Sequence, residues 1–402
     1  MNVVRAVKLG FPLIALAVLC TLGVSKETAA SDNAAPSLAV SSASTSAPAP
    51  VAGDVSNLVP AIVELATPQL CGAITVFDQE DVGTLCNPIA LAATPITSPS
   101  CPQTVSGSVR LETDLLCFDT SGLIVGSDNT IIDLNGHEIV CVGVGYSGSC
   151  QNGQVTLNVV GDVGVDTNDR NNVHVFSHLP GGTIDGFDVG VFSRADSDNV
   201  KVKQLTITGP AGIPGNDRLF SIAIFVLGDH CNGGKVHLGG GTNTGNDLSN
   251  HLRGIHVQLA TCIYAGYNTI HDIKDNTAGG TDFSVGIALV QATDNHVRGN
   301  IVTDNGDNGS FEGGLALQAT SRNLLVDNQV NNNNGNGIET LGGATNSYIN
   351  NNQMLYNTQV DAFTAPLVGD ENRWNFNNRC QTQTTPEPPP GVCNPGEVPP
   401  PQ

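Results

Sequence analysis

Residues 295–305 read NHVRGNIVTDN, with asparagine at Asn295, Asn300 and Asn305. An apolar residue, Val297 or Val302, follows two positions after each of the first two asparagines. Short apolar runs that alternate with polar residues are typical of short β-strands. Asparagine and glycine between such runs suit tight turns, because both adopt the left-handed backbone conformation. The stretch therefore predicts short strands separated by bends.

The same pattern recurs along the chain. Residues 286–306 (GIALVQATDNHVRGNIVTDNG) align with residues 314–335 (GLALQATSRNLLVDNQVNNNNG), and further Gly-aliphatic pairs begin at Gly190, Gly254 and Gly337. Polar-x-aliphatic signals advance together with these pairs, which indicates a repeat architecture. One repeat cannot bury its own apolar face, but stacked repeats can. The sequence therefore predicts a parallel β-helix of about nine turns, in which the amides of stacked asparagines bond along the axis.

The motif N-x-[VIL]-x-x-N-x-[VIL]-x-x-N at residues 295–305 resembles the right-handed parallel β-helix repeat family of the pectate-lyase-like superfamily. Residues 128–140 (DNTIIDLNGHEIV) resemble the entry segment of many exported members, and the resemblance covers residues 100–378. It implies an all-β, right-handed solenoid. It implies no single activity, because the superfamily includes pectate lyases, polygalacturonases and alginate epimerases. The motifs that distinguish polygalacturonases and alginate epimerases do not occur in the sequence.

The ends of the chain differ in composition from its repeats. Arg5 and Lys8 precede an apolar run that is shorter than the roughly 20 residues of a membrane-spanning helix, which favours a cleaved export signal. We therefore expect no membrane span after signal removal and a secreted, periplasmic or cell-surface location. A cap is expected before the first coil, because an uncovered strand edge would pair with other chains. The predicted segments are a signal (1–30), an Ala/Ser/Pro-rich linker (31–54), an N-terminal cap (55–128), β-helix repeats (129–380) and a Pro-rich tail (381–402).

Cysteine content and charge limit the possible environments and partners. Ten of the 11 cysteines follow the signal, and an even number in an exported chain favours disulfides. The net charge of −21 argues against nucleic acid as a partner. It also disfavours polyanionic sugars unless a cation bridges or basic residues cluster locally. Proximity suggests the disulfide pairs Cys71–Cys86, Cys101–Cys117, Cys141–Cys150, Cys231–Cys262 and Cys380–Cys393, although the sequence alone does not fix the connectivity.

Basic residues recur at one position of the repeat. The third residue after five successive polar anchors is basic, which predicts an outward-facing basic column. That column comprises His174, Lys201, His237, His271 and Arg298.

A second group, Arg253 and His256, flanks the Gly254–Ile255 signal, and Ala223 and Ala288 are the predicted column neighbours of His256. A lyase or C5-epimerase acting on uronate polymers needs a base for the sugar C5 proton and a cation for the carboxylate. His256 or His271 as the base and Arg253 or Arg298 as the cation would meet these needs. The alternative is that outward positions simply carry polar side chains.

Calcium is a possible cofactor. The loop TDNGDNGSFEGG (303–314) offers hard oxygen ligands among glycines, a composition that suits calcium. It lacks the spacing of an EF-hand or of a nonapeptide calcium repeat, and turns of this fold are rich in Asp and Asn in any case. The candidate ligands are Asp304, Asp307, Asn308 and Glu312.

These observations favour an exported β-helix that engages extracellular or cell-wall polysaccharide along its long face, without a recognisable catalytic motif. Two alternatives remain open. One is a polysaccharide lyase or epimerase that uses His256, His271, Arg253 and Arg298. The other is a structural or adhesive surface protein whose Pro-rich tail contacts a partner.

Overall fold

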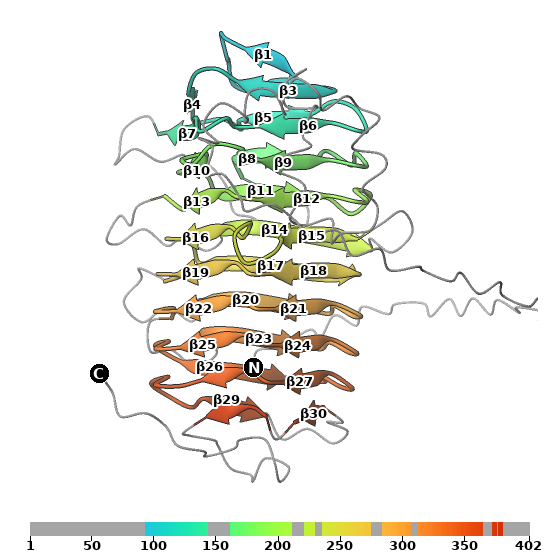
Figure 1. The fold of residues 1–402 in the computed structure, drawn as a ribbon, viewed down its shortest axis with the longest axis vertical. Helices are drawn as coiled ribbons and strands as arrows, with labels where there is room; N and C mark the ends of the chain where they lie inside the picture. Colours follow the sequence, from blue (N-terminus) through green and yellow to red (C-terminus); the bar gives the residue numbers. More distant parts are fainter. Residues whose placement is uncertain are drawn as a thin grey trace, which may run out of the picture. The chain divides into compact units, whose positions relative to one another are not determined.

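Successive strands of the chain pass in turn through three parallel sheets, so that each coil adds one strand to each sheet (Figure 1). The computed structural model describes residues 93–143, 161–210, 221–229, 235–274, 284–306, 312–364, 372–375 and 377–380. All of them belong to one unit, Ile62–Gln402. The described residues form strands and turns but no helix, and hence none that could cross a membrane.

The strands divide into sheets A, B and C. Sheet A comprises β1 (Thr94–Ile96), β3 (Ser108–Leu111), β6 (Ile131–Asp133), β9 (His174–Phe176), β12 (Lys201–Lys203), β15 (Val236–Gly239), β18 (Ile263–Gly266), β21 (His296–Arg298), β24 (Leu324–Val326), β27 (Tyr348–Asn350) and β30 (Arg373–Trp374). Sheet B comprises β2 (Gln103–Val105), β5 (Leu123–Val125), β8 (Val163–Asp166), β11 (Val189–Ser193), β14 (Ile222–Asp229), β17 (Arg253–Thr261), β20 (Val285–Val290), β23 (Gly313–Gln318), β26 (Asn336–Leu341) and β29 (Ala362–Thr364). Sheet C comprises β4 (Leu115–Phe118), β7 (Glu138–Val142), β10 (Thr183–Asp185), β13 (Thr206–Thr208), β16 (Asp247–Ser249), β19 (Thr269–His271), β22 (Ile301–Thr303), β25 (Gln329–Asn331), β28 (Gln353–Met354) and β31 (Arg379–Cys380).

The interior is a column of aliphatic side chains contributed by all three sheets. Val297 at the centre of β21 is 1 % exposed, whereas its neighbour Arg298 faces solvent. Val302 and Leu289 from the same stretch of chain join Val297 in the core. Each such burial contributes on the order of 1.5–3 kcal/mol. The predicted alternation between inward and outward positions is therefore confirmed in this coil.

Asparagines form the predicted ladders at the bends. Asn268 and Asn300 illustrate the arrangement: the backbone N–H and the Nδ2 of Asn268 both donate to Oδ1 of Asn300. Nδ2 of Asn300 donates in turn to the carbonyl oxygen of Ala265 and to Oδ1 of Asn328. Each amide thus satisfies buried backbone groups as well as its neighbour, as buried polar groups require. The longest ladder comprises Asn246, Asn268, Asn300, Asn328, Asn352 and Asn378.

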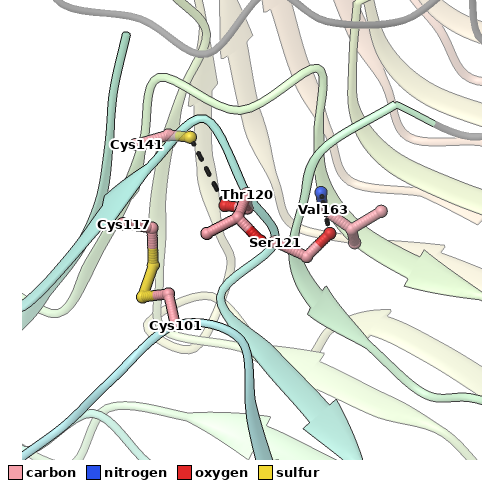
Figure 2. The surroundings of a disulfide bond; sticks show 6 residues. All are labelled: Cys101, Cys117, Thr120, Ser121, Cys141 and Val163. Atoms are coloured by element: carbon pink, nitrogen blue, oxygen red, sulfur yellow. Dashed lines mark hydrogen bonds between the residues drawn. A yellow bond between two sulfur atoms is a disulfide. The ribbon is translucent and has the colours of Figure 1, made fainter. Parts of the chain in front are cut away.

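A disulfide joins the loop before β2 to strand β4 (Figure 2). It links Cys101 to Cys117, as predicted, with the two Cα atoms 5.2 Å apart. Cys141 on the neighbouring strand β7 lies close by, with its Sγ 3.6 Å from the carbonyl oxygen of Thr120. Cys141, Cys262 and Cys380 are also disulfide-bonded. Their predicted partners Cys150, Cys231 and Cys393 lie outside the described residues, as do both members of the predicted pair Cys71–Cys86.

The coils begin earlier than the predicted boundary at residue 129. Strands β1 to β5 already pair within the three sheets, so the second half of the predicted cap belongs to the β-helix. These early coils close with aliphatic side chains and the Cys101–Cys117 disulfide in place of asparagine, so the repeat pattern does not reveal them. Each sheet has at least ten strands in the described part, and the sequence predicts about nine turns. Residues 1–92 and the tail from 381 lie outside the described residues.

Candidate functional site

The outer face of sheet A carries a row of ring and cationic side chains. The register pairs His174 with Lys201, Lys201 with His237, His237 with Tyr264 and Tyr264 with His296. We call these five residues the sheet A ladder. They stand at outward positions because the residue that follows each of them in its strand is in the core.

Three of the ladder side chains are in ring contact. The centroid of the Tyr264 ring lies 5.6 Å from that of His237 and 5.3 Å from that of His296, which it meets edge-on. Gly266 makes this packing possible, because a Cβ at that position would lie 2.6 Å from the Tyr264 hydroxyl oxygen. The residues two positions after each ladder residue form a second outward row of the sheet. The Tyr264 ring therefore lies over this second outward row. The last three members of the ladder thus form a continuous surface of imidazole and phenol rings.

Four cations lie on or next to the strands that carry the ladder. Lys201 belongs to the ladder, Lys203 and Arg298 lie in the second outward row, and Lys235 precedes β15. Lys201, Lys235 and Arg298 are exposed. No carboxylate occupies β9, β12, β15, β18 or β21, the five strands that carry the ladder. A locally basic face thus exists on a chain whose net charge is −21.

The ladder histidines are neutral at neutral pH. Burial, together with the charges of Lys203 and Lys201, lowers the pKa of His174 to about 3. Burial and the charges of Lys201 and Lys235 lower the pKa of His237. Burial, Arg298 and Lys235 lower the pKa of His296, against a smaller opposite effect of Asp327. A neutral imidazole offers one hydrogen-bond donor and one acceptor, although Nε2 of His174 and Nε2 of His296 are buried.

The ladder corrects the basic column predicted from the sequence. His174, Lys201 and His237 are aligned as expected, but the next two members are Tyr264 and His296. The two predicted members that fail are His271 and Arg298. His271 lies in β19 of sheet C, and Arg298 is in the second outward row of sheet A. The error arises because asparagine opens strands in both sheets, so the N-x-aliphatic signal does not say which sheet follows.

The four predicted catalytic residues are not brought together. Arg253 and His256 are neighbours in β17, where Nη1 of Arg253 lies 3.1 Å from Nδ1 of His256. His271 is on sheet C and Arg298 on sheet A, so the four residues lie on three different sheets. The structure therefore does not bring the predicted acid–base group together in a single centre.

Of the remaining pair, His256 is buried and Arg253 is half-buried. His256 is 3 % exposed, and burial and the charge of Arg253 lower its pKa, against a smaller opposite effect of its contact with Gln258. Its column neighbours are Phe225 and Ala288, so the predicted neighbour Ala223 is wrong.

His271 has the opposite electrostatic surroundings. Its Nε2 lies 3.0 Å from Oδ1 of Asp247, and its Nδ1 lies 2.9 Å from Oδ2 of Asp272. Burial alone would lower the pKa of His271, but the two aspartates raise it overall. This histidine is thus held by carboxylates on sheet C, whereas the ladder histidines lie among cations on sheet A.

Sequence reasoning missed a buried carboxyl group on the outer side of sheet B. Glu339 in β26 is 2 % exposed, and Nδ2 of Asn336 donates to its Oε2 at 2.8 Å. Its Oε1 has no hydrogen-bond partner among the described residues. Burial raises the pKa of Glu339 to about 7, although the bond from Asn336 acts in the opposite direction. The only sequence signal is a glutamate where the two preceding coils have Ala316 and Ala288.

Glu339 and His256 occupy the same column of sheet B, three coils apart. With ~4.8 Å between paired strands, the separation is ~14 Å. That is too far for the two groups to act on one glycosidic bond, where paired carboxyl groups lie at most about 9.5 Å apart. Glu339 therefore does not complete the predicted catalytic group.

The predicted calcium ligands are only partly visible. Oδ2 of Asp304 accepts a hydrogen bond from the hydroxyl group of Thr303 at 3.1 Å. Glu312 is buried and directly precedes β23. Asp307 and Asn308 lie outside the described residues. Within the described ranges, no group of three or more His, Cys, Asp or Glu residues could hold a metal ion. Calcium binding by this loop stays a prediction.

Comparison with known proteins agrees with the observed fold. Residues 189–359 match the family model described as the right handed beta helix region, which confirms the right-handed parallel β-helix inferred from the repeats. Among curated proteins, none matches the chain.

Similar solved structures include a mutant tailspike protein of E. coli bacteriophage HK620 in complex with a pentasaccharide. It is 11 % identical, with a TM-score of 0.40, and the match covers 71 % of this chain and 58 % of the tailspike chain. The A-module of the mannuronan C-5 epimerase AlgE6 of Azotobacter vinelandii is 12 % identical, with a TM-score of 0.35 and coverage of 74 % and 92 %. The chain thus spans less than two thirds of the tailspike protein. At these identities and scores the similarities concern the fold and carry nothing about function.

Proposed function

We propose that the protein binds an extended polysaccharide along the outer face of sheet A. The observation that supports this proposal is the sheet A ladder, in which His237, Tyr264 and His296 form a continuous ring surface bordered by cations. Aromatic rings present a large apolar face with a polar edge, which suits the C–H faces and hydroxyl groups of sugars. The neutral imidazoles add hydrogen-bond donors and acceptors.

A polymer fits this surface better than a small molecule does. The ladder spans five strands, so four intervals of ~4.8 Å give a length of ~19 Å along the axis of the coils. Ligand groups that repeat along a polymer can each meet another coil, and linked contacts strengthen one another. Extended faces of this kind are the binding surfaces that stacked repeats typically provide.

The proposal includes action outside the cell. Residues 1–30 have the composition of an export signal. The Cys101–Cys117 disulfide supports the same location, because such bonds persist in oxidising compartments. Extracellular and cell-wall polysaccharides are the polymers that an exported protein meets.

Affinity electrophoresis of the exported protein in gels that contain individual soluble polysaccharides tests the proposal. We expect retardation by at least one polymer. Tyr264→Ala should weaken that binding about tenfold, because it removes the central ring of the ladder. His237→Ala should weaken it as well.

The matched control is His271→Ala, which removes a partly exposed histidine from sheet C. It should leave the affinity unchanged, and circular dichroism should show that all three variants keep the β-sheet spectrum. Absence of binding to every polysaccharide, or equal losses for His237→Ala and His271→Ala, would refute the proposed site.

A further inference from the structure

We infer that the sheet A ladder takes an anionic polysaccharide, one whose sugars carry carboxylate or sulfate groups. This inference rests on the proposed function and adds the chemical class of the ligand. Its basis is the arrangement of charge on the five strands that carry the ladder.

Two exposed cations on this face, Lys201 and Lys235, are available to a bound anion. Neither Lys201 nor Lys235 forms an ion pair with a carboxylate in the part of the chain that the structure describes. Arg298 contacts Asp327 at 3.2 Å, but both side chains are substantially exposed, so the pair is open to a competing anion. Like charges placed together on an otherwise acidic chain cost free energy, and a bound anion removes that cost.

The fields of these cations overlap across neighbouring coils. Lys201 acts on both His174 and His237, and Lys235 acts on both His237 and His296. Each of these two lysines therefore lies close to two histidines of the ladder. An acidic group that binds beside any one of these histidines is within reach of at least two positive charges.

Sheet C in the corresponding coils lacks this character. Its outward residues are mostly hydroxyl side chains and carboxylates, among them Thr206, Asp247 and Thr269. The cation Lys274 near this sheet is paired with Asp272 at 2.9 Å. A polyanion would be attracted to sheet A and repelled by the aspartates of sheet C.

The basic face also has defined ends. Strand β6, which precedes it, carries Asp133, and strand β24, which follows it, carries Leu324 and Val326 at the outward positions. Cations are thus concentrated on or next to the five strands that carry the ladder. The coincidence of rings and cations on one ~19 Å stretch is the observation that distinguishes an acidic glycan from a neutral one.

The test compares each acidic polymer with its own neutral form. The full-length exported protein is titrated calorimetrically with a polyuronate and its carboxyl-reduced product, and with a sulfated glycan and its desulfated product. We expect at least one acidic polymer to bind about tenfold more tightly than its neutral form, with affinity that falls as salt is added. The two arms show whether carboxylate or sulfate is the preferred group.

Lysine variants locate the effect. Lys201→Gln and Lys235→Gln should each weaken binding of the acidic polymer roughly two- to fivefold, the range expected for single exposed charge pairs. Lys274→Gln, on sheet C, is the matched control and should bind as tightly as the unmodified protein.

The outcomes separate this inference from the proposed function. Equal affinity for acidic and neutral forms, with Tyr264→Ala still weakening both, would overturn the inference and leave polysaccharide binding by the ladder intact. Equal losses for Lys274→Gln and Lys201→Gln would also overturn it, because the charge effect would then not belong to sheet A. If none of the four polymers binds, both the inference and the proposed function are contradicted.

Discussion

The amide of Asn268 and the amide of Asn300 stack one coil apart, with Nδ2 of Asn268 3.0 Å from Oδ1 of Asn300. The same Oδ1 accepts the backbone N–H of Asn268, and Nδ2 of Asn300 reaches the carbonyl oxygen of Ala265. Both residues are fully buried. Because Nδ2 of Asn300 also donates to Oδ1 of Asn328, this one side chain links three successive coils, and these bonds require an amide.

Replacement of Asn300 should therefore be severe. In Asn300→Ala, the donors of Asn268 and the carbonyl of Ala265 lose their partner in a buried site. An unsatisfied buried group costs ~1–3 kcal/mol, so we expect a total loss of ~3 kcal/mol or more in the free energy of unfolding. Urea unfolding followed by circular dichroism measures it. Gln329→Ala, an exposed position in the neighbouring coil, should change stability by less than ~0.5 kcal/mol.

The alternation in β21 gives a second prediction. Val297→Asp places a carboxylate in the apolar interior, and the protein should lose cooperative unfolding. Arg298→Ala removes only an exposed pair with Asp327, so its cost should stay below ~1 kcal/mol. Thermal unfolding of the two variants provides the measurement. Comparable damage from both would contradict the observed orientation of the strand.

The sheet A ladder should respond to pH. His237 and His296 have pKa values below the usual 6.5, so they are neutral at pH 7.5 and gain charge only as the medium becomes acidic. The groups that face them are Tyr264, Lys201, Lys235, Arg298 and Asp327. New positive charge on this face should tighten binding of an acidic polymer as the pH falls towards 5.

Calorimetry at pH 7.5 and pH 5 measures that response. The double variant His237→Asn, His296→Asn should bind with an affinity that changes little between the two values. His174, with a pKa of about 3, stays neutral throughout this range. His174→Asn is therefore the control: it replaces a ladder histidine but should leave the pH dependence of binding unchanged. An unchanged pH dependence in the double variant would assign the effect to other groups.

The fold could be predicted from the sequence because its structural unit repeats along the chain. A buried aliphatic residue such as Val297 and a ladder asparagine such as Asn300 recur at the same positions of many coils. One correct assignment of inward and outward residues therefore applies along the chain. The early coils lack the asparagines and were therefore assigned to a cap.

Site residues depend on register, which the repeat signal fixes less well. In β14, alanine replaces the usual glycine: Ile224 pairs with Ile255, so Ala223 occupies the glycine position. The Gly-aliphatic pattern therefore places the column two residues too early in β14, so Phe225 was missed as the neighbour of His256. Tyr264 was missed for another reason: the asparagine signal in its coil opens β19 of sheet C, whereas the column on sheet A is set by three-dimensional pairing. Glu339 has no motif at all, because its surroundings come from coils that are distant in sequence.

Glu339 gives the last prediction, on the pH dependence of stability. The folded state holds this carboxyl group with a pKa of about 7, whereas the ordinary value is 4.5. The folded protein therefore binds more protons than the unfolded chain between these values, and stability falls as the pH rises through that window. A shift of this size corresponds to about 3 kcal/mol.

Glu339→Gln keeps the shape of the side chain and cannot ionise, so it should be more stable than the unmodified protein at pH 8 and similar to it at pH 4.5. Urea midpoints at the two pH values measure the difference, and Glu138→Gln, an exposed position on sheet C, is the control. A stability profile that Glu339→Gln does not flatten would show that Glu339 is ionised in the folded protein at little cost.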